Sequence, residues 1–285
     1  MKLMLKIKNL IKTLLCKKQK KIVVQVNVVQ LTPNDLLKNR SALITGGSSG
    51  IGFAIAEAYL KAGAKVVITS RSETKLNDAI SKLSAFGECS GVVLDVTNVD
   101  ILETQFKSAL SKYGRIDILV NNAGVSGARI GSATEEEWDN VLNTNLKGVF
   151  FLSQIAGKYM KDNQIHGNIL NISSASSLRP AACAYTISKW GIRGFTMGLA
   201  RTLLPYDIVV NALAPGPTAT PLLKKETTED IALPNTPSSR YALPMEIANM
   251  AVVLVSDMSR LIVGDTVFMT GGAGNINNGD IDYDF

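Results

Sequence analysis

Short apolar runs alternate with segments of helical periodicity along most of this 285-residue chain. Helices cover both faces of a parallel sheet, so its strands are buried on both sides and read as short, continuous apolar runs. The alternation therefore predicts a single α/β domain built on a doubly wound, parallel, seven-stranded sheet, which binds ligands at the carboxyl ends of its strands. The expected strands are residues 41–45, 65–69, 91–94, 116–120, 168–172, 208–213 and 266–269.

The domain is expected to span residues 37–285, behind an N-terminal extension of residues 1–36. The chain has a formal net charge of +6, but residues 1–21 contain eight lysines and no acidic residue, so the remainder is slightly acidic. The basic charge therefore does not indicate a nucleic-acid-binding domain. Apolar residues recur at helical spacing in this tail, which predicts a basic amphipathic helix able to lie on an anionic membrane. An oligomer contact or a disordered appendage are the alternatives, and a short strand is expected at 24–28.

The expected location is cytoplasmic. No uninterrupted apolar run approaches the ~20 residues that span a bilayer, and lysines interrupt the tail where a secretory signal would be apolar. Peripheral membrane contact through residues 1–21 is an open alternative.

Composition also limits the chemistry. His166 is the only histidine, and the three cysteines, Cys16, Cys89 and Cys183, show no paired spacing. These counts exclude multi-histidine metal sites, cysteine-based zinc sites and a Ser-His-Asp mechanism, so no metal site is expected. Proton transfer must use tyrosine, lysine or a carboxylate.

A glycine-rich turn follows the first expected strand and precedes a helix expected over residues 53–62. This strand–turn–helix order is the Rossmann arrangement for phosphate binding, in which glycines let the backbone approach a pyrophosphate and the helix N-terminus supplies free N–H groups. The spacing Gly-x3-Gly-x-Gly differs from the commoner dinucleotide fingerprint. The residues expected at the phosphates are Gly46, Ser48, Ser49, Gly50, Ile51 and Gly52.

The end of the second strand indicates which nicotinamide cofactor binds. An acidic residue there would accept hydrogen bonds from the ribose 2′-hydroxyl and repel a 2′-phosphate. This chain has Ser70 and Arg71 instead. Charge-assisted contacts to phosphate are strong, so NADP is favoured, with NAD as the alternative.

Three motifs occur in order along the chain: Thr45-Gly46-x3-Gly50-x-Gly52, Asn121-Asn122-Ala123-Gly124 and Tyr185-x3-Lys189, followed by the turn Pro215-Gly216. Together they resemble the short-chain dehydrogenase/reductase family over residues 37 to 275. The resemblance implies hydride transfer between a nicotinamide cofactor and a carbonyl or alcohol. It also implies a homo-oligomer, either a tetramer or a dimer.

Tyr185 and Lys189 are four residues apart and so share one helix face. A free phenol has a pKa near ~10, and a neighbouring ammonium favours the phenolate. By resemblance, Tyr185 is the general acid/base, and Lys189 lowers its pKa and contacts the ribose. Ser174 polarises the carbonyl, although a loop shorter than in relatives leaves Ser173 as an alternative. Asn145 holds a water beside the lysine.

The resemblance also assigns contacts along the rest of the cofactor. Asp95 and Val96 would contact the adenine ring. Asn122, Ala123 and Gly124 would contact the ribose and the nicotinamide. The carboxamide would be held by Pro215, Gly216, Thr218 and Thr220.

The resulting prediction is an NADP(H)-dependent oxidoreductase acting on a small or carrier-bound carbonyl, with 3-oxoacyl-acyl-carrier-protein reductases as the first analogy and no nucleic-acid partner. The alternatives are an NAD-dependent alcohol or sugar dehydrogenase and a non-catalytic cofactor-binding regulator. Substrate specificity is expected in residues 126–132, 176–184 and 217–240. Within the last range, residues 221–237 are expected to form a mobile lid.

Two tryptophans, Trp138 and Trp190, are expected to pack as helix residues.

Overall fold

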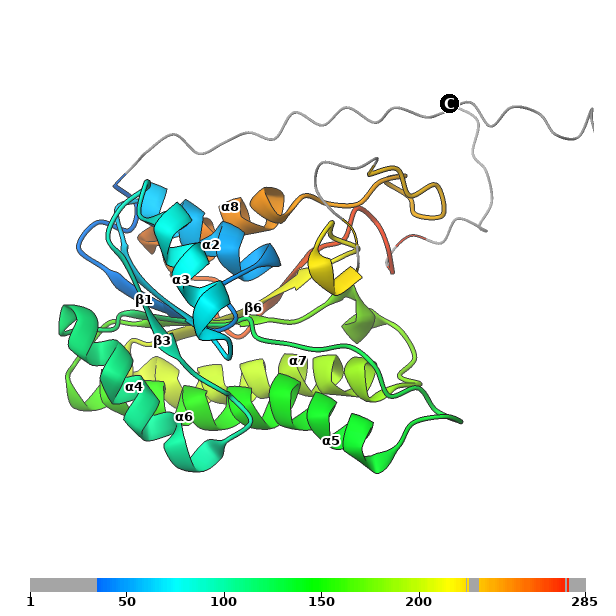
Figure 1. Cartoon of the computed structure of the whole chain (residues 1–285), viewed down its shortest axis with the longest axis horizontal. Coiled ribbons are helices and arrows are strands. Elements are labelled where there is room, and N and C mark those ends of the chain that lie inside the picture. The colour runs from blue at the N-terminus through cyan, green and yellow to red at the C-terminus, as the bar shows by residue number, and fades with distance from the viewer. Residues whose placement is uncertain (1–34, 224, 226–230, 275, 277–285) are drawn as a thin grey trace, which may run out of the picture.

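The computed structural model describes residues 35–223, 225, 231–274 and 276. The basic tail, the strand expected at 24–28 and part of the expected lid lie outside these residues. A parallel seven-stranded sheet forms the centre, in the order β3-β2-β1-β4-β5-β6-β7 (Figure 1). The strands are β1 Ser41–Ile44, β2 Lys65–Ser70, β3 Cys89–Val93, β4 Ile118–Asn121, β5 Asn168–Ile172, β6 Val209–Pro215 and β7 Thr266–Met269. The predicted doubly wound sheet is confirmed.

Helices cover both faces of this sheet (Figure 1). One layer contains α2 Gly50–Lys61, α3 Glu73–Leu83 and α8 Pro244–Val255, and the other contains α4 Val99–Tyr113, α5 Glu135–Leu142, α6 Gly148–Asp162 and α7 Ala184–Leu203. Successive side chains of a strand point to opposite faces of the sheet, so alternate residues of β1 pack against different helix layers. Ala42 and Ile44 pack with α2 and α8, whereas Leu43 packs with α4 and α6.

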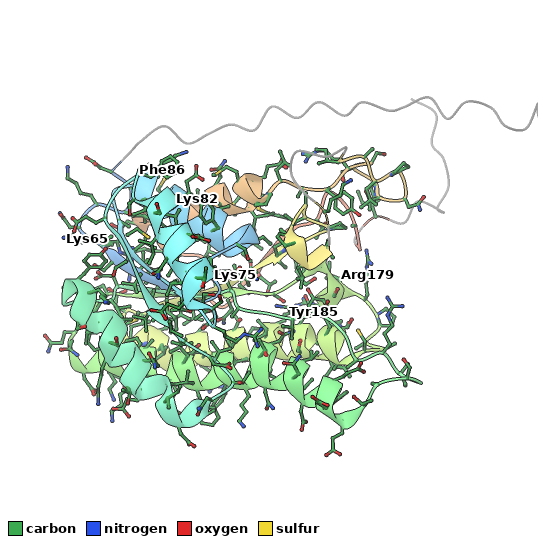
Figure 2. The ribbon with its side chains drawn as sticks, in the orientation of Figure 1. Lys65, Lys75, Lys82, Phe86, Arg179 and Tyr185 are labelled. Atoms are coloured by element: carbon green, nitrogen blue, oxygen red, sulfur yellow. The ribbon has the colours of Figure 1, made fainter. Side chains whose placement is uncertain are left out.

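The covering helices are amphipathic. In α3, Leu76, Ala79 and Leu83 are buried, and Lys75 and Lys82 lie on the solvent side (Figure 2). Within the described part of the chain, no helix is both long and apolar enough to cross a bilayer.

Helix α2 joins the beginning of the domain to its end. It packs against α8, and the fully buried Tyr59 donates a hydrogen bond to the carbonyl of Ala251 at 3.2 Å. The N-terminal end of α2 follows the glycine-rich turn, so α8 supports the helix that this turn opens.

Several bounds differ from the sequence predictions; for example, β3 begins at Cys89 rather than at residue 91, and β4 begins at Ile118 rather than at residue 116. Helix α2 begins at Gly50 rather than at residue 53. Trp138 and Trp190 are on helices as predicted, and they are 40% and 42% exposed.

Candidate active site

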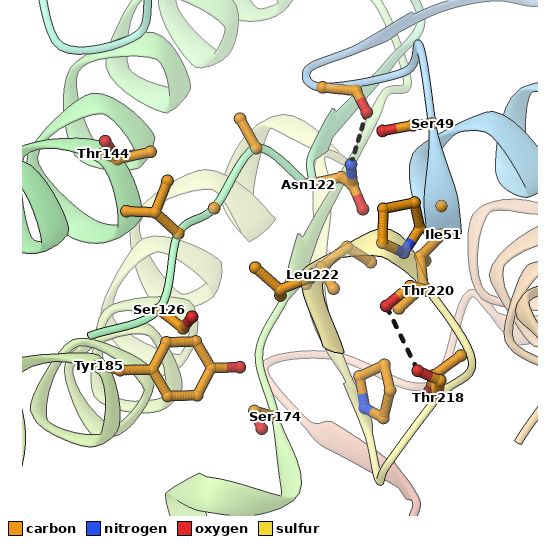
Figure 3. A pocket seen from close by; sticks show the side chains of 18 of the residues that line it. Ser49, Ile51, Asn122, Ser126, Thr144, Ser174, Tyr185, Thr218, Thr220 and Leu222 are labelled. Atoms are coloured by element: carbon orange, nitrogen blue, oxygen red, sulfur yellow. Dashed lines mark hydrogen bonds between the residues drawn. The ribbon is translucent and has the colours of Figure 1, made fainter. Parts of the chain in front are cut away.

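A pocket of about 460 Å³ lies at the carboxyl ends of the strands. Strand order reverses between β1 and β4, which is where a doubly wound sheet opens a crevice for ligands. Nineteen of the residues predicted for the site line this pocket (Figure 3): Gly46, Ser48, Ser49, Gly50, Ile51, Ser70, Arg71, Asp95, Val96, Asn122, Ala123, Gly124, Ser174, Tyr185, Lys189, Pro215, Gly216, Thr218 and Thr220. Gly52 and Asn145 are not among the lining residues and lie behind them.

The glycine turn forms a cradle that only glycine permits. Gly46 and Gly50 have φ values of 64° and 56°, in the left-handed region. A Cβ on Gly52 would lie 2.4 Å from Asn122 Nδ2 and 2.5 Å from the Gly46 carbonyl oxygen. Ser49 caps α2 without a side-chain hydrogen bond, so its hydroxyl remains available along with the N-terminal N–H groups. This concave, donor-rich turn fits a pyrophosphate.

Asn122 holds the cradle in place. Its Nδ2 donates to the carbonyl oxygens of Thr45 at 2.9 Å and Gly46 at 3.1 Å. In return, the Thr45 hydroxyl accepts hydrogen bonds from the backbone N–H groups of Asn122 and Ala123. The second motif therefore supports the first, and Thr45, which was not predicted as a site residue, connects them.

Polar residues at the ends of β2 and β3 line one end of the pocket, beyond the glycine turn. Arg71 is exposed and lines the pocket directly after β2. Asp95 is held by a local turn, because its Oδ1 accepts hydrogen bonds from the backbone N–H of Thr97 at 2.9 Å and from its hydroxyl at 2.8 Å. Arg71 is thus the cation at this end of the pocket.

Tyr185, Ser174 and Lys189 meet at the opposite end. The phenol of Tyr185 and the hydroxyl of Ser174 lie close together in the pocket (Figure 3). Lys189 is only 5% exposed, and its Nζ lies 5.7 Å from the centroid of the Tyr185 ring. The same Nζ donates a hydrogen bond to the Ile172 carbonyl oxygen at 2.8 Å, which fixes the ammonium beside the end of β5.

Burial governs the titration of both groups. Burial lowers the pKa of Lys189 to about 8. It raises the pKa of Tyr185 above its ordinary value, and the hydrogen bond with Ser174 partly opposes this rise. Lys189 is not among the groups that shift the pKa of Tyr185 here, where its ammonium is bound to the Ile172 carbonyl oxygen, so the lowering of the tyrosine pKa by Lys189 stays a prediction.

The two candidate serines have different environments. Ser173 donates its hydroxyl to the Lys189 carbonyl oxygen at 3.2 Å, so it is tied to the backbone of α7. Ser174 interacts with Tyr185 and accepts a hydrogen bond from the Ser176 N–H. The geometry favours Ser174 for contact with a reacting oxygen.

Asn145 lies in a π-helical turn, Asn143–Lys147, between α5 and α6. Such turns are frequent at functional sites. Its side chain accepts from the Val125 N–H and donates to the Val125 carbonyl, both at 2.8 Å, and it reaches the Ser188 hydroxyl at 3.2 Å. It therefore ties the chain after β4 to the helix that carries Tyr185.

Thr144 is a pocket residue that the sequence predictions missed. It is 5% exposed and lines the pocket, and its hydroxyl has no hydrogen-bond partner among the described residues. A buried hydroxyl without a partner is costly, so its position in the pocket wall fits a ligand with polar atoms. Its only sequence signal was its place next to Asn145. No cluster of metal-binding side chains occurs in the part of the chain that the structure describes.

Comparisons with known proteins agree with this site. The sequence matches the short chain dehydrogenase family over residues 40–231. It is 37% identical over 242 residues to a 3-oxoacyl-[acyl-carrier-protein] reductase of Thermotoga maritima, and the match covers 83% of this chain and 98% of the relative.

Two solved structures are similar over the whole domain. The 3-ketoacyl-(acyl-carrier-protein) reductase of Brucella melitensis complexed with NADH has a TM-score of 0.77 at 30% identity, covering 84% of this chain and 99% of that one. A variant of actinorhodin polyketide ketoreductase with NADPH has a TM-score of 0.77 at 32% identity, covering 83% and 98%. The sheet, the pocket and these matches lead to one conclusion: the chain belongs to the short-chain dehydrogenase/reductase family, and it is an oxidoreductase that acts on keto or hydroxyl groups.

Proposed function

We propose that the protein is an NADP(H)-dependent reductase of a 3-oxoacyl substrate or a related carbonyl compound. The observation that carries this proposal is one pocket with Arg71 at one end and Ser174, Tyr185 and Lys189 at the other. Two of the relatives described above, from Thermotoga maritima and Brucella melitensis, are named as acyl-carrier-protein reductases, which supports a carrier-bound substrate.

In this mechanism the nicotinamide cofactor, when bound, supplies or accepts the hydride. The Tyr185 hydroxyl donates a proton to the carbonyl oxygen during reduction and accepts it during oxidation. Ser174 donates a hydrogen bond to the same oxygen as negative charge develops on it. Lys189 places its ammonium next to Tyr185, and Asn145 would hold a water on the path by which the proton is replaced.

The cofactor would lie across the switch point of the sheet. The glycine turn, residues 46–52, would hold the pyrophosphate, and Thr144 would offer its free hydroxyl. The segment after β3 would contact the adenine, and the segment after β4 would contact the ribose and nicotinamide. The segment after β6 would contact the carboxamide, in each case through the residues predicted for that role. The buried Thr144 hydroxyl and the glycine cradle are the features of this chain that fit such a group.

NADP is proposed over NAD because of Ser70 and Arg71. Arg71 can pair with a 2′-phosphate, and no carboxylate follows β2 to accept the ribose hydroxyl. The solved relatives include one with NADH and one with NADPH, so the choice rests on this chain's own residues.

The cofactor proposal is tested by titrating NADPH and NADH against wild type and Arg71→Ala by nicotinamide fluorescence. We expect Arg71→Ala to weaken NADPH binding about tenfold, as loss of one charge-assisted contact does, and to leave NADH binding unchanged. The exposed Arg201 on α7 gives the matched control, Arg201→Ala. Tighter binding of NADH by wild type, or no effect of Arg71→Ala, would contradict the NADP assignment.

A homo-oligomer is also proposed. Helix α7 carries an exposed apolar face formed by Ile187, Trp190 and Met197, of which Met197 is 56% exposed. Solvent-exposed apolar patches of this kind commonly mark protein interfaces. A monomer in sedimentation velocity at micromolar concentration would contradict this.

The N-terminal extension, residues 1–36, is proposed to precede a domain of residues 37–285 and to bring it to anionic membranes through the basic tail. Liposome co-sedimentation with and without residues 1–21 tests this, and equal pelleting of the two proteins would refute it.

A further inference from the structure

The pocket contains one cation that the proposed reaction does not use. Only four charged side chains are among its described lining residues. Arg71 and Asp95 are at the ends of β2 and β3, and Lys189 is bound to the Ile172 carbonyl. Arg179 is the fourth, and it lies at the end of the pocket that carries Tyr185 (Figure 2).

Arg179 is on the short loop between Ser174 and Tyr185, and α7 fixes this loop from below. Trp190 Nε1 donates a hydrogen bond to the Arg179 carbonyl oxygen at 2.8 Å. Arg193 Nη1 donates to the Ser177 carbonyl oxygen at 3.4 Å, and its guanidinium lies 5.5 Å from the Trp190 ring centroid. The Trp190 indole thus supports the loop from a partly exposed position. These contacts hold the Arg179 backbone in place a few residues from the reacting hydroxyls.

The Arg179 side chain is exposed at the pocket, and none of the ion pairs formed within the described residues includes it. Asp95, the sole acidic side chain of the described lining, belongs to the β3 end. The exposed Leu222 and Leu223 add apolar side chains to the pocket wall, and Leu222 lies between the glycine turn and the Tyr185 end (Figure 3). The pocket thus offers one guanidinium at the end of the reacting hydroxyls and apolar side chains in its wall.

We propose that Arg179 binds an acidic group of the substrate, a carboxylate or a phosphate, while the carbonyl is at Tyr185 and Ser174. The planar fork of a guanidinium matches both anions and pairs with them in bidentate fashion. The substrate is then an oxo compound with an anionic group and an apolar portion. The anion comes either from the substrate acid itself or from the phosphate of a thioester carrier arm. This inference rests on the proposed carbonyl reduction and adds the class of substrate.

The test uses the full chain with NADPH and two matched pairs of substrates. Acetoacetate and its methyl ester differ in the carboxylate. Acetoacetyl-4′-phosphopantetheine and acetoacetyl-pantetheine differ in the phosphate of the carrier arm. We expect wild type to favour the anionic member of one pair by about tenfold in kcat/KM, which is the usual effect of one charge-assisted contact.

Arg179→Ala should remove this preference by lowering kcat/KM for the anionic member alone, Arg179→Lys should keep part of it, and Arg201→Ala should keep all of it. Loss in the first pair identifies a substrate carboxylate, and loss in the second identifies a carrier phosphate. Trp190→Phe, which removes the hydrogen bond to the Arg179 carbonyl, should reduce the anion preference with little effect on the neutral member.

Saturation-transfer NMR on the NADPH-loaded protein measures the same preferences as binding, independently of turnover. The inference is overturned if wild type shows no anion preference in either pair, or if Arg179→Ala weakens both members equally. Reduction of the neutral members at the rates of the anionic ones contradicts only the role of Arg179. Absence of binding of NADPH and NADH contradicts the proposed function itself.

Discussion

Replacing Lys189 by methionine tests how strongly this side chain is perturbed by burial. Its ammonium is enclosed in the protein, and its pKa falls from 10.5 to about 8. A difference of about 2.5 pKa units corresponds to about 3 kcal/mol by which the folded state disfavours the charged lysine. Lys189→Met removes this cost at pH 7, and the gain is smaller than 3 kcal/mol because the Ile172 carbonyl loses its partner.

The pH dependence separates the two effects. Below pH 8 the lysine is charged in both states, and the full cost of burial is present. Between pH 8 and 10.5 the folded lysine releases its proton while the unfolded one keeps it. The unfolded state then binds more protons, so the free energy of unfolding of wild type rises with pH, whereas the variant lacks this rise. Between pH 7 and 9.5, the free energy of unfolding of wild type should therefore rise by about 2 kcal/mol relative to that of Lys189→Met.

The assay is urea unfolding of both proteins at the two pH values, followed by circular dichroism and checked for reversibility. Lys112→Met, at an exposed lysine near the end of α4, is the matched control and should show no such change relative to wild type. If the difference between wild type and Lys189→Met stays constant from pH 7 to 9.5, Lys189 titrates as an ordinary lysine and the reasoning is refuted.

Three further predictions concern the pocket. Gly52→Ala should abolish measurable cofactor binding in fluorescence titration, because its Cβ would overlap Asn122 Nδ2 at 2.4 Å, and retained affinity would contradict the cradle. Thr144→Val should raise the free energy of unfolding by about 1 kcal/mol, since a buried unsatisfied hydroxyl is removed, and should weaken NADPH binding several-fold. Urea unfolding and titration measure both effects, and a fall in stability would count against the free hydroxyl. Tyr185→Phe should lower kcat by about 10²–10⁴-fold and leave cofactor affinity intact, as expected for a general acid, and near-normal turnover would exclude that role.

The sequence revealed the sheet because burial on both faces leaves a strong apolar signal. Strand β5, for example, was predicted with the bounds that the structure has, and all its residues are buried. The start of α2 was missed because glycines favour turns, whereas in the fold Gly52 lies close to Asn122 and Gly46, and Gly50 lies close to Thr220 and Pro221.

The parts of the site whose chemistry follows from residue type alone were predictable. The parts whose role depends on contacts between distant side chains were less so. The convergence of the glycine turn with Tyr185 followed from the motifs and their order. The direction of the Lys189 ammonium, the unpartnered Thr144 hydroxyl and the support that Trp190 gives to Arg179 depend on side chains far apart in the sequence. No local pattern encodes such contacts.

The packing of α2 against α8 has a consequence for the newly made chain. The hydrogen bond from Tyr59 to Ala251 spans 192 residues, so the surface of α2 that faces α8 has no cover until nearly the whole domain has left the ribosome. At about 5–20 residues per second, this surface remains uncovered for roughly 10 s or more. Nascent chains of this protein are therefore expected to expose this apolar surface to chaperones during that interval.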